Sequence, residues 1–164
     1  MRNDPSPKKR IPEVLRNRTF KRGNTMILYI NSKEKTIVAQ LPAAPYEVRT
    51  ICDAALRSRP AVVSVIDVSS QVGNLADHLS NVVLEYDTID KFNALAEKID
   101  RMNPWKQWTF SGALSIENVS SLDQALYLAD HLENYTFIPR QQKKSSAGPI
   151  GVYTVHGYVQ RRVS

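Results

Sequence analysis

Acidic residues at repeated helical positions are the side chains of this sequence whose types and spacing most suggest chemistry. Residues 88–100 read TIDKFNALAEKID and residues 121–133 read SLDQALYLADHLE, so a hydroxyl residue, an aliphatic residue and an Asp recur at an interval of 33. An internal Leu-Ala and two further acids recur as well. Each copy has the pattern of an amphipathic helix with carboxylates on its outer face.

Two interpretations of these acids follow. Acids on exposed helix faces commonly serve solvation, and an Asp in the first turn interacts favourably with the helix dipole. Alternatively, the carboxylates imitate the phosphates of DNA and steer the chain to a protein with a basic groove. Two of these acids lie just before the first copy, and the others lie within the two copies. The full set is Glu85, Asp87, Asp90, Glu97, Asp100, Asp123, Asp130 and Glu133.

Metal-binding and catalytic patterns are weaker. Leu-Ala-Asp-His-Leu occurs at residues 75–79 and 128–132, but adjacent side chains on a helix diverge by about 100° and do not converge on one ion. His156 is a third candidate metal ligand. The Asp-His pairs are better explained as ordinary polar side chains on the surfaces of helices. The sequence has no nucleophile elbow, and Gly148 to Gly151 lack the Lys-Ser or Lys-Thr of a phosphate loop. We expect no metal, no cofactor and no enzymatic activity.

Hydrophobic periodicity predicts the elements that position these residues. Strand formers at residues 26–30 and 36–41 flank a polar turn and predict a hairpin. Helical spacing over residues 46–57 and a β-branched run over residues 61–68 add a helix and a third strand, and residues 72–84 are expected to form a loop with a short helical turn. Cys52 is expected to be a buried thiol on the predicted helix.

From residue 85 onward the pattern is helical. Thr88 is expected to be the N-cap of the first copy, and Ser121 has the spacing to Gln124 of a capping box for the second. The two copies should pack through their apolar stripes, because a single helix of this length is marginal in water.

A middle helix is expected to begin at Pro104, with core anchors at Trp105, Trp108 and Leu114. Trp105, Trp108 and Phe110 could stack on bases, but their near-helical spacing favours core packing. Residues 137–139 should end the second copy, and residues 152–159 suggest a final strand or hairpin.

The predicted fold class is α+β: a small antiparallel sheet with a helix, followed by a small helical bundle and a C-terminal strand or hairpin. The expected divisions are a basic, partly disordered arm at residues 1–24, an α+β subdomain at 25–84, a helical subdomain at 85–139 and a basic C-terminal segment at 140–164.

Charge is unevenly distributed along the chain. Residues 1–23 hold eight Lys or Arg against two acids, residues 24–139 hold nine against fourteen, and residues 140–164 hold five against none. The N-terminal arm is either a solubilising tail or a phosphate-binding extension. Its candidate nucleic-acid-binding residues are Lys8, Lys9, Arg10, Arg16, Arg18, Lys21 and Arg22. No apolar run reaches the ~20 residues that span a bilayer, and no secretory signal is recognisable, so a cytoplasmic location is expected.

Several segments in order resemble ArdA-type antirestriction proteins of mobile elements. They are Leu41-Pro42-Ala43-Ala44-Pro45, the run from Asp87 to Ala96, Met102-Asn103-Pro104-Trp105, the helix that begins Ser121-Leu122 and runs on to Asn134-Tyr135-Thr136-Phe137-Ile138-Pro139, and the closing run from Gly151 to Val159. The resemblance implies an elongated, non-enzymatic protein of a phage or conjugative element that imitates DNA, forms dimers and occupies the DNA-binding groove of type I restriction enzymes.

This chain departs from that pattern, since its central part is only mildly acidic and both ends are basic. A CRISPR nuclease complex is therefore a second candidate target, with the basic arms contacting guide RNA or DNA. The expected function is stoichiometric inhibition of a bacterial DNA-targeting nuclease. The alternative is a nucleic-acid-binding accessory protein that acts through its basic arms.

Overall fold

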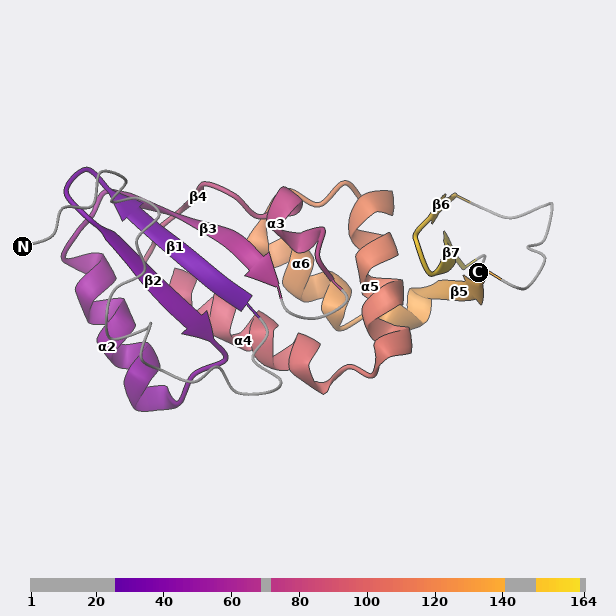
Figure 1. The fold of residues 1–164 in the computed structure, drawn as a ribbon, viewed down its shortest axis with the longest axis horizontal. Coiled ribbons are helices and arrows are strands. Elements are labelled where there is room, and N and C mark those ends of the chain that lie inside the picture. Colours follow the sequence, from indigo (N-terminus) through magenta and orange to yellow (C-terminus); the bar gives the residue numbers. More distant parts are fainter. Residues whose placement is uncertain (1–25, 69–71, 141–149, 163–164) are drawn as a thin grey trace, which may run out of the picture.

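Three parts follow one another along the long axis of the molecule (Figure 1). The computed structural model describes residues 26–68, 72–140 and 150–162. In chain order the parts are a four-stranded antiparallel sheet with a helix, a group of helices and a three-stranded antiparallel sheet. This arrangement confirms the α+β class.

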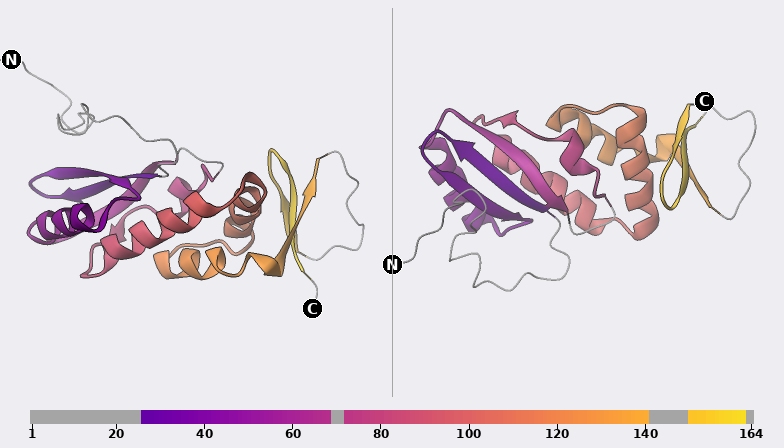
Figure 2. Two further views of the ribbon diagram at one scale, coloured as in Figure 1. Left: turned by 90° about the horizontal axis from the view of Figure 1, so that it is seen from below. Right: turned by 45° about the horizontal axis from the view of Figure 1, so that its top comes forward.

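The first sheet has the strand order β2-β1-β3-β4, and all its neighbours are antiparallel. Its strands are β1 (Met26–Ser32), β2 (Thr36–Leu41), β3 (Ala61–Val68) and β4 (Val82–Val83). Alternate residues of β1, namely Met26, Leu28 and Ile30, are buried, as the period of a half-buried strand requires. Helix α2 (Pro45–Leu56) lies along one face of this sheet (Figure 2).

The central helices are α3 (Leu75–His78), α4 (Thr88–Arg101), α5 (Pro104–Ile116) and α6 (Leu122–Ala129), followed by the 3-10 turn η2 (Leu132–Asn134). The two copies of the repeat are α4 and α6, and they pack against each other as expected. Both contribute buried apolar stripes at helical spacing, from Ile89 to Ile99 in α4 and from Leu122 to Leu128 in α6.

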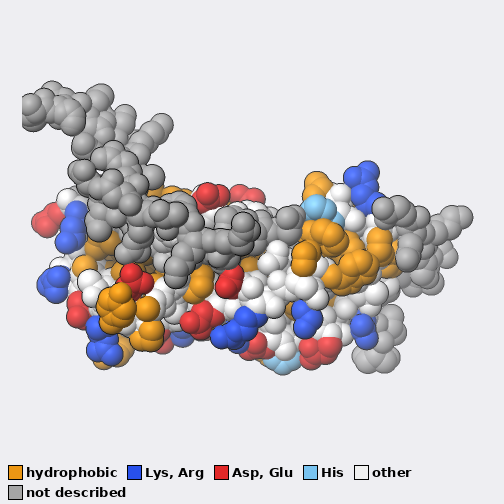
Figure 3. Space-filling model, turned by 60° about the horizontal axis from the view of Figure 1, so that its bottom comes forward, with side chains coloured by type: hydrophobic (Ala, Val, Ile, Leu, Met, Phe, Trp, Pro, Cys, Tyr) orange, Lys and Arg blue, Asp and Glu red, His pale blue; other side chains and the backbone are white. Residues whose placement is uncertain are grey.

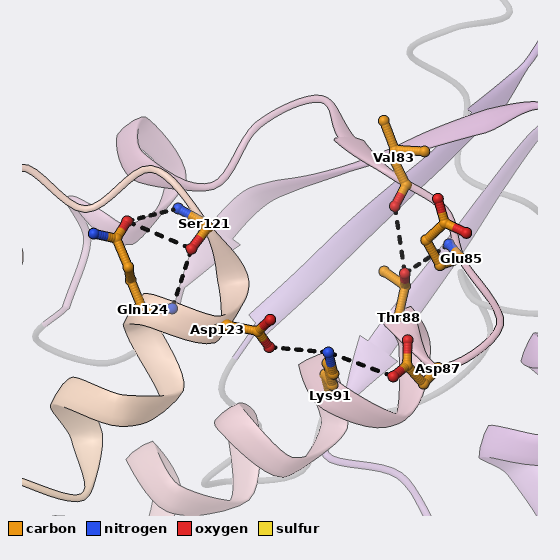
Figure 4. A network of polar contacts seen from close by, with 8 residues as sticks. All are labelled: Val83, Glu85, Asp87, Thr88, Lys91, Ser121, Asp123 and Gln124. Carbon is orange, nitrogen blue, oxygen red and sulfur yellow. Dashed lines mark hydrogen bonds and ion pairs between the residues drawn. The ribbon is translucent and has the colours of Figure 1, made fainter.

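The starts of the two repeated helices differ from each other (Figure 4). The capping box of the second copy is confirmed, since Ser121 Oγ accepts the Gln124 N–H at 3.1 Å and Gln124 Oε1 accepts the Ser121 N–H at 3.2 Å. The prediction for Thr88 was wrong. Asp87 occupies the N-cap, and the buried Thr88 hydroxyl accepts the Glu85 N–H at 2.7 Å and donates to Val83 O at 3.3 Å. Thr88 therefore closes the loop before the helix.

The second copy is shorter as a helix than the sequence pattern suggested. It ends at Ala129, because the N–H groups of Asp130 and His131 bond the carbonyls three residues back, those of Tyr127 and Leu128, at 3.1 and 2.9 Å. Nδ1 of the His131 ring lies 2.7 Å from the carbonyl oxygen of Tyr127, which accepts a hydrogen bond from it. The imidazole therefore caps the end of the helix.

The C-terminal sheet has the order β5-β7-β6, with β5 (Tyr135–Pro139), β6 (Gly151–Tyr153) and β7 (Gly157–Arg161). A final strand or hairpin was expected, and β6 and β7 form a hairpin. Strand β5 was not expected. Residues 137–139 do more than end a helix, because Tyr135 and Phe137 alternate inward and the strand pairs with β7. The C-terminal sheet therefore includes β5, whose residues belong to the range 85–139 that was expected to be helical. This sheet packs on α5.

Replacing Ser121 with Ala should lower the free energy of unfolding by about 1 kcal/mol, because the Gln124 N–H would lose its acceptor at the helix start. Urea denaturation followed by circular dichroism measures this. Ser120→Ala is the matched control, since Ser120 bonds Gln124 through its backbone N–H. Equal stability of the two variants would contradict a contribution of the cap.

Candidate protein-binding surface

The structure divides the eight predicted acids into two groups. Four of them lie in ion pairs with basic residues of α4: Asp87 and Asp123 with Lys91, Asp130 with Lys98, and Glu97 with Arg101. Within the described part of the chain, the other four make no ion pair: Glu85, Asp90, Asp100 and Glu133.

Ion pairs run along the contact between α4 and α6, which we call the α4–α6 seam. Lys91 Nζ lies 2.9 Å from Asp123 Oδ1, and Lys98 Nζ lies 2.7 Å from Asp130 Oδ1. The partners advance by seven residues on both helices, so α4 and α6 run parallel. The Asp123 hydrogen bond is the main cause of the raised pKa of Lys91, to which Asp87 adds.

One acidic face across both copies therefore does not form. The lysine side of α4 faces α6, and its two lysines compensate the first two acids of the second copy. Figure 4 shows the first of these pairs, Lys91 with Asp123. The sequence shows equivalent acids at equivalent positions, but it does not show which side of one helix meets the other. The third acid, Glu133, lies beyond the end of α6 in η2.

The remaining acids lie along α4, on the loop before it, and on α2. We define the acidic band as Asp53 of α2, Glu85, and Asp90, Glu97 and Asp100 of α4. Asp90 and Glu97 are seven residues apart, which places them on one side of α4 about 10 Å from each other. Glu97 is also 4.0 Å from Arg101, whose side chain is largely exposed while that of Glu97 is half-buried, and this long pair compensates its charge weakly.

The thiol of Cys52 reports on the charge where α2 meets α4. Cys52 is buried, as the sequence predicted. Burial is the main cause that raises the pKa of its thiol, and the negative charges of Asp90 and Asp53 raise it further, opposed in part by Arg49. An acid from each helix thus acts on the same atom, which places Asp53 and Asp90 near the contact between α2 and α4.

The predicted basic arm lies outside the described residues. This applies to all seven of its candidate nucleic-acid-binding residues: Lys8, Lys9, Arg10, Arg16, Arg18, Lys21 and Arg22.

The three histidines are held separately. His78 Nδ1 lies 2.9 Å from Val119 O, His131 stacks on Tyr127, and His156 stacks on Trp108 with ring centroids 4.4 Å apart. Across residues 26–68, 72–140 and 150–162, no three His, Cys, Asp or Glu side chains are grouped so that they could hold a metal ion.

The aromatic residues of α5 follow the packing prediction in part. Phe110 and Leu114 are fully buried, and Trp108 packs against the core. Trp105 was wrongly expected to be an anchor, since 48% of its surface is exposed beside Lys106. A weak signal of this difference is present in the sequence: Trp105 is in the first turn of the helix, next to a lysine.

Comparison with known proteins adds no relative, since no family model, curated protein or solved structure matches this chain. The resemblance to ArdA-type proteins therefore stays a prediction. No helix among the described residues has the length and apolar character needed to cross a membrane.

Proposed function

We propose that this chain is a non-enzymatic anti-defence protein that inhibits a bacterial DNA-targeting nuclease by stoichiometric binding. The target is a restriction-modification enzyme or a CRISPR nuclease complex, and the acidic band occupies part of its DNA-binding groove. The observation that carries the proposal is that Glu85, Asp90 and Asp100, on α4 and the loop before it, make no ion pair with another described residue. The sequence resemblance supplies the class of partner.

The dimensions of the band support partial imitation of DNA. Helix α4 has 14 residues and is about 21 Å long, which is the axial rise of about six base pairs. The five acids of the band are fewer than the phosphates on that length of duplex. A partner groove would therefore be filled in part, with electrostatic steering increasing the association rate.

Neutralising the band should weaken inhibition. We expect the triple variant Asp90→Asn, Glu97→Gln, Asp100→Asn to require about tenfold more protein for half-inhibition. The reason is that each of these charges contributes roughly 0.5 kcal/mol to the free energy of binding. The difference should shrink as salt is raised. The measurement is DNA cleavage by a panel of purified type I restriction enzymes and CRISPR nucleases, titrated with the full chain.

The matched control removes three exposed acids outside the band, through Glu34→Gln, Asp67→Asn and Asp77→Asn. It changes net charge by the same amount and should leave inhibition unchanged. Full inhibition by the folded band variant would refute the role of the band. Inhibition of many nuclease molecules by one inhibitor molecule would refute stoichiometric action.

A further inference from the structure

A groove with basic and aromatic walls lies where α4, α5, η2 and β5 meet. Its volume is about 580 Å³, which is in the range of small-ligand sites. Four cationic side chains and two acidic ones line it: Lys98, Arg101, Lys106, Arg162, Asp130 and Glu133. Figure 3 shows hydrophobic side chains gathered on the half of this face that contains the C-terminal sheet, with basic and acidic side chains along their margin.

The positive charge of this groove is only partly compensated. Lys98 is held by Asp130 at 2.7 Å, so these two charges cancel. Arg101 meets Glu97 at the long distance of 4.0 Å, and Lys106 makes no ion pair with another described residue. Arg162 donates from Nε to Tyr135 O at 3.4 Å and keeps its charge. Three cations, of which Arg101 is weakly paired, therefore face Glu133, an acid without an ion pair among the described residues.

Trp105 provides an aromatic surface beside these cations. Its ring contacts Phe137 edge-on at a centroid distance of 4.8 Å and lies 6.2 Å from Trp108. These neighbours hold the indole in place while almost half of the residue stays in solvent. An ordered, exposed indole next to uncompensated cations is the combination that single-stranded nucleic acids use, with bases stacked on the ring and phosphates on the cations.

We propose that this groove binds single-stranded DNA or RNA, with one base on Trp105 and the flanking phosphates at Lys106, Arg101 and Arg162. A duplex keeps its bases stacked inside and cannot use the indole in this way. An acidic peptide would satisfy the cations but has no planar group for the ring. The groove meets the acidic band at the Glu97–Arg101 pair, but it binds a different class of ligand and goes beyond the proposed inhibition of a nuclease.

The test uses the full chain and the emission of Trp105. The chain has two tryptophans, so a Trp108→Phe background leaves Trp105 as the sole indole. Titration with a 15-mer of oligodeoxythymidine or oligouridine should quench this emission, and the affinity should fall as salt is raised. Binding through residues 1–25 alone would leave the emission unchanged, and that result would overturn the proposal.

Substitutions then separate stacking from general charge. In fluorescence anisotropy with labelled oligonucleotide, Trp105→Ala should weaken binding about tenfold, the middle of the range for one stacked base, and Trp105→Phe should retain most of it. Tyr127→Ala is the matched control, since that aromatic is exposed on α6 outside the groove. Lys106→Gln should weaken binding several-fold, whereas Lys33→Gln in the β1–β2 turn should not.

Two outcomes would count against the site. Unchanged affinity in Trp105→Ala and Lys106→Gln, with both variants folded by circular dichroism, would place binding elsewhere. Quenching of Trp105 by poly-glutamate to the same extent would show a general anion site. If Trp105→Ala does not fold, Lys106→Gln and the quenching of Trp105 still decide, because both leave the packing of Trp105 against Phe137 in place.

Discussion

Replacing Gly112 with Ala is expected to lower the free energy of unfolding by about 3 kcal/mol, the upper part of the range for overpacking. Gly112 lies in the buried face of α5, where β7 crosses it. A Cβ at this position would lie 2.4 Å from both Cβ and Cγ2 of Val159. Val159 is fully buried in the central strand of the C-terminal sheet, so α5 and the sheet would have to separate.

The usual preference of helices for Ala over Gly opposes this effect by about 1 kcal/mol and does not outweigh it. Urea denaturation measures the loss, and limited proteolysis shows whether the C-terminal sheet detaches first. Gly73→Ala is the control, because a Cβ there has no atom within 4 Å. Its stability should change by less than about 0.5 kcal/mol. Equal behaviour of the two variants would mean that α5 and β7 do not pack closely.

The second large effect concerns the polar cluster of Tyr135, Glu117 and Arg161, which fastens β5 and β7 to the end of α5. The Tyr135 hydroxyl donates to Glu117 Oε2, and the Arg161 guanidinium donates to the same oxygen from Nη2 at 2.9 Å and from Nε at 3.2 Å. Tyr135→Phe should lower the free energy of unfolding at pH 7 by about 2 kcal/mol, since it removes a bond to a charged acceptor.

The same cluster predicts a loss of stability at alkaline pH. Burial, together with the hydrogen bond to Glu117, raises the pKa of Tyr135 from 10.0 to about 12. Between these values the folded chain keeps a proton that the unfolded chain has lost, so stability must fall as pH rises. The contribution is complete well below pH 10, and about 2 kcal/mol is lost by pH 12.

Glu117 acts in the opposite direction. Its hydrogen bond from Tyr135, with help from Arg161 and against the effect of burial, lowers the pKa of its carboxyl below the usual 4.5. A lowered carboxyl pKa contributes stability above the ordinary value, and this contribution is lost as pH falls through the folded-state value.

Urea midpoints measured between pH 7 and pH 11.5 test the alkaline prediction. The decline should be steeper in the native chain than in Tyr135→Phe. Tyr46→Phe is the matched control, because Tyr46 is exposed on α2 and should keep the native pH dependence. A native-like decline in Tyr135→Phe would mean that another group causes it.

The two proposed surfaces have different charges and different tests. Neutralising the acidic band should weaken binding to a nuclease but not to oligonucleotides, since Glu97→Gln only removes an acid beside Arg101 of the groove. Trp105→Ala should weaken binding to oligonucleotides and leave binding to the nuclease unchanged. Failure of one test therefore leaves the other proposal standing. A chain that carries both surfaces could engage a nuclease that is loaded with guide RNA, and the pair of variants measures this directly.

The local elements could be predicted because short-range sequence determines them. The alternating residues of β1, the apolar stripe of α4 and the Ser121–Gln124 capping box each depend on neighbours within a few positions. Strand β5 was missed because its inward residues, Tyr135 and Phe137, show their role only when α5 and β7 are present to cover them.

By itself, the sequence determined the class of fold, the repeat and the number of acids, since these depend on composition and period. Tertiary structure alone decided which acids are paired among the described residues. Because α4 and α6 run parallel, Lys91 and Lys98 meet Asp123 and Asp130, whereas Asp90 and Asp100 of α4 have no basic partner there. Tertiary packing also leaves Trp105 about half exposed among cations. Charge balance across a helix contact depends on the sides that meet, and no pattern within a single helix contains that information.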